Sequence, residues 1–228
     1  MRENHLRGCA GPTAVGNTVM WREGSWQSLQ AGTRCDPRWP EYAEYARLRS
    51  AGLRDAALRE ADLLAASLMT QDTRTCWAFT SWIFQEVMGP STVKSMVLPQ
   101  PLEQVVLETL WSSLGNVQAW QWLAQWFPIN VAESRGSSTD ALRDFLREGL
   151  MKHPSDPLLS QMLAQHLIAW VKIDTADLSN GRYDGDPNAD LERLTEAAGL
   201  ISGDDPLNAS ISELQATVTS WLNREPGR

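Results

Sequence analysis

The sequence predicts an all-α fold of stacked antiparallel helical hairpins, a helical-repeat-like architecture with eight or nine helices. Apolar residues recur at spacings of three and four along almost the whole chain from Pro40 to Leu222, as they do on one face of a helix. Nowhere do β-branched residues alternate with a period of two, so no sheet is predicted. Glycine and proline divide the periodic stretches into short helices, and short connections favour antiparallel neighbours.

The helices follow one another with few breaks. The first is predicted from about Pro40 to Ser50, with Pro40 in the first turn, where its missing N–H costs little. The stretch 75–89 has few polar residues and predicts a mostly buried helix that ends at Gly89 and Pro90. The apolar faces of the other helices are marked, in chain order, by Ala57, Ala61, Leu64 and Leu68; by Leu102, Val106, Leu110 and Leu114; by Leu142, Phe145, Leu146, Gly149 and Leu150; by Leu159, Met162, Leu163, His166, Trp170 and Ile173; by Leu191, Leu194, Ala198 and Ile201; and by Ile211, Leu214, Val218 and Trp221.

Composition sets the domain organisation. Residues 1–19 show no periodicity and are predicted to be a disordered arm, or a stretch upstream of a true start at Met20. Residues 20–228 are predicted to form one all-α domain. From about Asp174 to the end there are 11 acidic and 4 basic residues, whereas the preceding part is nearly neutral. This balance suits a basic protein partner and argues against nucleic acid, because phosphate contacts need clustered Lys and Arg.

The predicted location is cytoplasmic, with no membrane partner. No apolar run approaches the roughly 20 residues that cross a bilayer, and residues 1–19 hold no apolar segment typical of a secretory signal. The three cysteines, Cys9, Cys35 and Cys76, are widely spaced and include no Cys-x-x-Cys pair. This spacing argues against a disulfide framework or a zinc ribbon and suits a reducing compartment.

Two stretches resemble parts of a tetratricopeptide repeat. In "YARLRSAGLRDAALREADLLAASL", Leu48, Gly52 and Ala57 fall near the places of a large residue, a glycine and a small alanine of that motif. "DALRDFLREGLMKHPSDPLL" is similar to the second helix and closing proline of a repeat, from Ala141 to Pro154, with the proline one residue out of place. The resemblance covers about 45 residues, without a strict repeat period. It implies hairpin stacking and a protein-binding surface, not a named activity.

The stretch "RYDGDPNADLERL" raises the question of a calcium site. Such a loop has oxygen ligands at its first, third and fifth positions, a glycine at the sixth and a glutamate at the twelfth. With Asp184 first, however, the sixth residue is Ala189 and the twelfth is Thr195. Helix-start signals explain more of the stretch, with Asp186 as N-cap and Pro187 in the first turn. Asp190 would then lie near the positive end of the helix dipole, and we predict no metal site.

No catalytic constellation is recognisable. His166 lies in an apolar stripe one turn before Trp170 and is predicted to be a neutral core histidine with one satisfied N–H. No His-Glu-x-x-His pair, nucleophile elbow, phosphate-binding glycine loop or Cys–His arrangement occurs. The sequence therefore predicts no catalytic, cofactor-binding or metal-binding residue, and no cofactor.

Tryptophan is unusually frequent, with 11 residues against 3 Tyr and 4 Phe. In "NVQAWQWLAQWF", Trp122 and Trp126 lie on the helix face opposite that of Trp120, among glutamines. A helix that is apolar on two sides is either sandwiched between layers or presents a second face to a partner, and both readings stay open here. Within the pair we expect Trp126 to be buried and Trp122 to be the more exposed.

These observations predict a non-enzymatic, cytosolic helical-repeat protein that binds another protein. Its predicted partner-binding residues are Trp122, Trp126, Asp184 and Asp186. A bacterial immunity protein or an adaptor fits the size, the acidity and the missing catalytic motifs, and 17 Arg against 3 Lys indicates a high-GC bacterial genome. Two alternatives stay open: an all-α enzyme or small-ligand-binding module with a Trp-lined pocket that contains His166, and a homodimer that covers its own apolar face.

Overall fold

The computed structural model of the chain describes residues 38–88, 97–128, 130–131, 140–203 and 205–224. The predictions for residues 1–19, for Met20, for Cys9 and Cys35 and for the helix end at Gly89 and Pro90 lie outside these residues.

Within the described residues the chain forms nine α-helices and no strand, so the all-α prediction is confirmed. A π-helix, η1 (Ile83–Val87), continues α4, and a 3-10 helix, η2 (Leu178–Asn180), follows α10. No helix in this part of the chain is both long and apolar enough to cross a membrane. The α-helices are α2 (Pro40–Ser50), α3 (Arg54–Met69), α4 (Thr73–Trp82), α6 (Gln100–Ser112), α7 (Val117–Trp126), α9 (Ala141–Lys152), α10 (Pro157–Asp174), α11 (Pro187–Leu200) and α12 (Leu207–Arg224).

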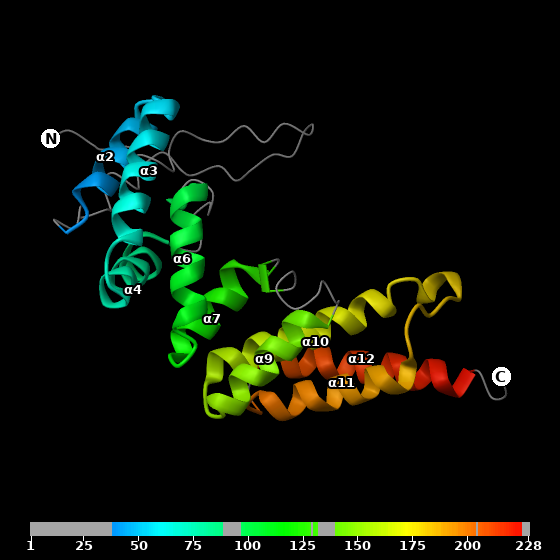
Figure 1. Cartoon of the computed structure of the whole chain (residues 1–228). Helices are drawn as coiled ribbons and strands as arrows, with labels where there is room; N and C mark the ends of the chain where they lie inside the picture. The colour runs from blue at the N-terminus through cyan, green and yellow to red at the C-terminus, as the bar shows by residue number, and fades with distance from the viewer. Residues whose placement is uncertain (1–37, 89–96, 129, 132–139, 204, 225–228) are drawn as a thin grey trace, which may run out of the picture.

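The helices form two arms that meet at α7 (Figure 1). In the first arm α2 pairs with α3, and α6 packs against α3 and α4. In the second arm α10 packs against α9, α11 and α12. The short helix α7 contacts α6 on one side and α9 and α10 on the other, so it joins the arms. The predicted hairpin stacking is present in the α2–α3 pair and in the second arm, where consecutive helices run back and forth, whereas α4 crosses the α2–α3 pair (Figure 1).

One hydrophobic cluster contains side chains from all nine α-helices. The predicted face of α3 is confirmed, because Ala57, Ala61, Leu64 and Leu68 are all buried. Gly52 makes the turn that returns α3 onto α2, and its φ of 76° lies in the left-handed region that glycine adopts without strain.

The join between the arms is built around Trp120, which is fully buried. Its indole Nε1 donates a hydrogen bond to the Leu114 carbonyl oxygen at 2.8 Å, and its ring lies 4.4 Å from that of Phe145 in α9. Gly149 lets α9 approach closely, since a Cβ atom there would stand 3.1 Å from Cε3 of Trp120. A small residue at this crossing therefore lets the second arm pack against α7.

Two predicted helix faces are wrong in detail. In α10 the core face is formed by Leu159, Leu163, Leu167 and Val171, whereas Ile173 is 70% exposed. In α11 Ala197 is buried and Ala198 is exposed. Both helices carry apolar residues over a wide arc, and the positions of the neighbouring helices decide which part of that arc is covered.

Candidate functional site

Four aromatic side chains pack in a row where the α4–η1 helix meets α7, and three of them are stacked. Trp122 lies between Trp77 and Phe84, with ring centroids 5.6 and 4.7 Å away and interplanar angles of 30° and 18°. Phe84 also contacts Trp126 at 6.3 Å. We call these four residues the aromatic row. Offset stacks of this kind are favourable beyond the area they bury, so each ring restricts its neighbours.

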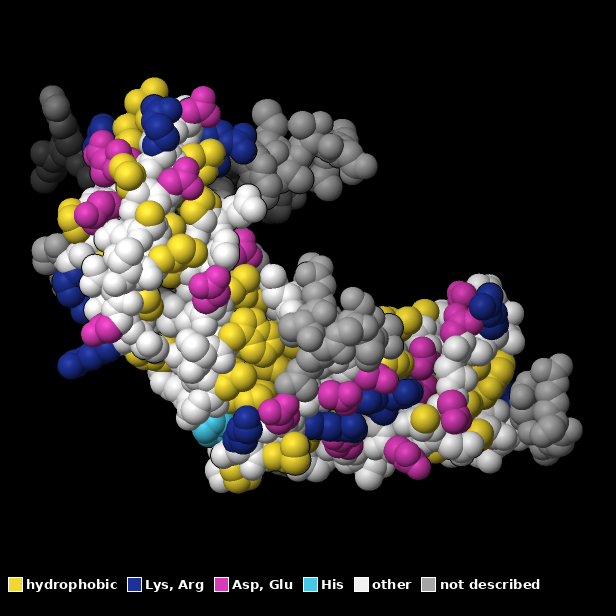
Figure 2. Space-filling model, viewed as in Figure 1, with side chains coloured by type: hydrophobic (Ala, Val, Ile, Leu, Met, Phe, Trp, Pro, Cys, Tyr) yellow, Lys and Arg dark blue, Asp and Glu magenta, His cyan; other side chains and the backbone are white. Residues whose placement is uncertain are grey.

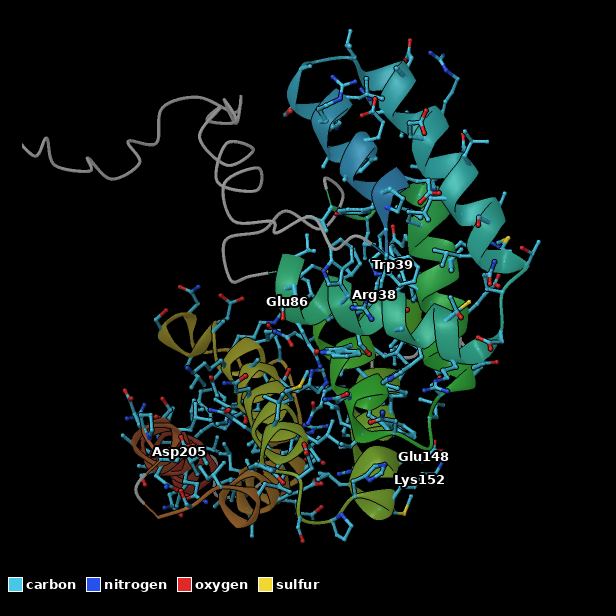
Figure 3. The ribbon with its side chains drawn as sticks, turned by 90° about the vertical axis from the view of Figure 1, so that its left-hand side faces the viewer. Arg38, Trp39, Glu86, Glu148, Lys152 and Asp205 are labelled. Carbon is cyan, nitrogen blue, oxygen red and sulfur yellow. The ribbon has the colours of Figure 1, made fainter. Side chains whose placement is uncertain are left out.

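Helix caps and a π-helical turn position the rings of the aromatic row. Asp72 caps α4 by accepting a hydrogen bond from the Thr75 backbone N–H at 2.8 Å. Phe84 lies in the π-helical turn η1, a geometry that changes the direction of side chains and is frequent at functional sites. Figure 3 shows Glu86 of the same turn at the end of this helix, above the second arm. The start of α7 is capped by Asn116, whose side chain accepts a hydrogen bond from the backbone N–H of Gln118 at 3.0 Å.

Both tryptophans of α7 are half-buried. The expectation that Trp126 is buried is therefore wrong, because the rings of α4 and η1 cover only part of this face. Gln125, which lies between the two tryptophans in the sequence, is exposed. Gln121, which precedes Trp122, donates hydrogen bonds to both carboxylate oxygens of Asp156, at 3.0 and 2.9 Å. The aromatic row is thus supported from behind and partly open to solvent. Figure 2 shows further hydrophobic side chains gathered where the two arms meet.

The predicted helix start in the acidic stretch is confirmed. The Asp186 side chain accepts a hydrogen bond from the Asn188 backbone N–H at 3.0 Å, and Pro187 is the first residue of α11. Asp184 pairs with Arg182 at 2.5 Å. Both carboxylates therefore already have local partners. Among the described residues no three His, Cys, Asp or Glu side chains are grouped as metal ligands would be.

Asp190 lies in the first turn of α11, as predicted, and it is a fully buried carboxylate. It accepts a hydrogen bond from the Tyr183 hydroxyl at 2.6 Å and contacts the Arg193 guanidinium. Arg193 also lies 3.7 Å from Asp174 and over the Trp170 ring, 4.7 Å from its centroid. This network fastens α10, the loop after it and α11 together. The sequence signal that could have indicated this network is the spacing of Asp190 and Arg193. They are three residues apart in the first turns of α11, and side chains at this spacing can pair on a helix.

The network changes the ionisation of its members. Burial and the charge of Asp190 raise the pKa of Asp174, and Arg193 offsets part of this effect. Burial and the hydrogen bond to Asp190 raise the pKa of Tyr183, which keeps its proton as a donor. Gly185 packs against the Asp174 carboxylate, because a Cβ atom at this position would stand 2.2 Å from Oδ2 of Asp174. We assign this cluster a structural role.

The predicted partner-binding residues fall into two separate groups. Gln121 of α7 contacts Asp156 at the start of α10, and the backbone N–H of Asp184 donates to the carbonyl oxygen of Asp174 at its end. The 18 residues of α10 therefore separate the two groups by roughly 27 Å. One partner surface would have to extend along the second arm to reach both.

His166 is not the core histidine that was predicted. It is half-buried with its ring edge toward Trp170, at 6.2 Å, and its Nε2 has no hydrogen-bond partner among the described residues. Burial and the nearby Arg143 lower its pKa, so the neutral form is favoured. The described residues around it, His166, Ala169, Trp170 and Ile173, line a hollow of about 440 Å³ that includes no carboxylate. The charge of the Asp140 carboxylate also acts on the ring and offsets part of the lowering of the His166 pKa.

Comparisons with known proteins add no family. No protein-family model matches the chain, and searches of curated proteins and of solved structures give no match either. The tetratricopeptide-like interpretation therefore rests on the two sequence stretches, of which the first forms the α2–α3 hairpin.

Proposed function

We propose that this chain is a non-enzymatic helical protein that binds another protein, and that the aromatic row is part of its binding surface. The observation that carries the proposal is that Trp122 and Trp126 are half-buried, so part of each ring is open to solvent while rings of α4 and η1 pack against the rest. Tryptophan is enriched among the residues that dominate interface energetics. A side chain already held in place loses little conformational freedom when a partner binds it, which favours affinity.

Charge supports a basic partner. The described residues of the second arm, 140–203 and 205–224, contain 13 acidic and 7 basic side chains. An acidic surface attracts a basic protein over distances of about a Debye length and speeds its association. An immunity protein that covers a basic toxin and an adaptor for a basic protein both belong to this proposal.

The alternative of an enzyme or a ligand-binding module has less support. It requires a tryptophan-lined pocket in which His166 meets carboxylates, but Trp170 is the one tryptophan among the described residues that line the hollow beside His166. Trp77, Trp122 and Phe84 stack on one another, and Trp126 packs at a tilt against Phe84, so the four rings do not surround a space.

Site-specific photo-cross-linking in a lysate of the source organism tests the proposal. A photoreactive residue replaces Gln125, the exposed residue between the two tryptophans, or Gln71, an exposed residue in the first arm, as the matched control. We expect a basic protein to be captured from position 125 and not from position 71. Trp122→Ala should weaken its binding by roughly 30-fold, the effect of a loss of about 2 kcal/mol at an interface anchor. Equal capture from both positions, or capture unaffected by Trp122→Ala, would refute the proposal.

A further inference from the structure

The outer side of α10 lacks the charged residues that normally face solvent. This helix has 18 residues, of which only Lys172 and Asp174, both in the last turn, are charged. A helix at the surface of a domain usually has one apolar stripe toward the core and charged residues opposite. In α10, however, a second line of apolar side chains, separate from the buried Leu159, Leu163 and Leu167, is exposed or half-buried.

The outer residues form a second stripe with helical spacing. Leu158 is 38% exposed, Ile173 is 70% exposed, and Ala169 is exposed as well. Met162 and His166, between them, are half-buried. Successive members are three or four residues apart, so they lie in one line along the helix. We call these five residues the α10 stripe.

The α10 stripe has an uneven surface of the kind on which another helix can pack. The small side chain of Ala169 lies between larger ones, beside the hollow of about 440 Å³ whose other described lining residues are His166, Trp170 and Ile173. Trp170 forms one wall, and the Arg193 guanidinium lies over the face of its ring. A small side chain between larger ones can accept a side chain of a second helix.

We propose that the α10 stripe docks an amphipathic helix with lysine and arginine on its flanks, supplied by the basic protein partner; this inference rests on the proposed function. The spacing of the stripe matches the repeat of such a helix, and α10 is long enough to receive about five turns of it. Basic flanks suit the 13 acidic and 7 basic side chains of the described second arm.

Charge argues against a second copy of the chain as the occupant. A symmetric dimer through the α10 stripe would bring two equally acidic second arms together. Like charges across an interface disfavour the complex. Lys172 is the one basic residue of α10. The two guanidinium groups beside the stripe, Arg143 and Arg193, are already paired with Asp140 and Asp190.

The test uses the full chain and a labelled synthetic peptide of about 18 residues, the length of α10, with leucines at spacings of three and four and lysines elsewhere. Fluorescence anisotropy measures its binding to the wild type, to Ile173→Glu and to Leu63→Glu, which adds the same charge at a 62% exposed leucine of α3. Because a new carboxylate attracts the peptide's lysines, unspecific attraction would make both variants bind more tightly. Docking on the stripe should instead make Ile173→Glu bind about tenfold more weakly or worse, with Leu63→Glu unchanged or tighter.

Three results would overturn the inference: no binding to the wild type, equal or tighter binding by Ile173→Glu, or equal binding of a peptide with glutamates in place of the lysines. Sedimentation equilibrium tests for a fourth such result. If the wild type is a dimer and Ile173→Glu is a monomer, a second copy of the chain covers the stripe and the inference is overturned. Melting temperatures confirm that both variants are folded. If the inference alone fails, capture from position 125 persists in Ile173→Glu; if the proposed function fails, no basic protein is captured there at all.

Discussion

Removing the Asp190 carboxylate should destabilise the protein more than any other single charge change in α11. In Asp190→Ala, Tyr183 loses its acceptor at 2.6 Å, and Arg193 keeps only the more distant Asp174, 3.7 Å away, and the Trp170 ring. The Arg193 side chain is 20% exposed, so water replaces the lost partner poorly. Breaking one side of a buried ion pair costs about 3–5 kcal/mol, and we expect the lower end, about 3 kcal/mol, because Arg193 keeps part of its environment.

A loss of about 3 kcal/mol corresponds to a fall of roughly 6–12 °C in melting temperature for a domain of this size. Far-UV circular dichroism during heating, together with urea unfolding at neutral pH, measures it. Glu192→Gln is the matched control, since Glu192 is exposed on the same helix and should change stability by less than about 0.5 kcal/mol. Tyr183→Phe should lose about 1.5–3 kcal/mol, the usual value for a hydrogen bond to a charged group. If Asp190→Ala lowers the free energy of unfolding by less than about 1 kcal/mol, the argument that this network is buried and stabilising is refuted.

Three further predictions concern the join between the arms and His166. Trp120→Ala should lose about 3–5 kcal/mol in urea unfolding, because this fully buried ring fills the crossing; a loss under about 1 kcal/mol would show that the arms do not pack through it. Gly149→Ala should lose about 1 kcal/mol, since the new Cβ 3.1 Å from Trp120 costs more than the gain in helix propensity, and a rise in melting temperature would contradict this close approach. The lowered pKa of His166 means that folding favours the neutral ring, so its contribution is present above the unfolded pKa of about 6.5 and is lost as the pH falls through the folded value. In His166→Gln the free energy of unfolding should therefore decline less steeply between neutral and mildly acidic pH than in the wild type. An unchanged pH dependence would refute the lowered pKa of His166.

The sequence alone determined the local features of the fold, because these depend on neighbouring residues. The bounds predicted for the first helix, Pro40 to Ser50, are those of α2. The cap at Asp186 and the start of α11 at Pro187 were also predictable, since an N-cap satisfies backbone N–H groups two or three residues further on. Apolar residues at helical spacing were enough to establish that most of the chain is α-helical.

Tertiary structure decided how each helix is covered. Apolar residues cover a wide arc of both α7 and α10, and periodicity could not tell which part of the arc meets a neighbour. For that reason the exposure of Trp126 and of Ile173 was predicted wrongly, although both residues lie in correctly predicted helices. The π-turn at Phe84 likewise had no recognised signal in the sequence.

The buried state of Asp190 shows the same division most clearly. Its place in the first turn of α11 is local, but its burial requires Tyr183 from the preceding loop and the approach of α10. A carboxylate can leave water only where such partners replace the lost hydration, and residues from several elements must supply them together. Local sequence therefore determines where the helices of this protein lie along the chain, whereas packing between helices determines which side chains are left for a partner.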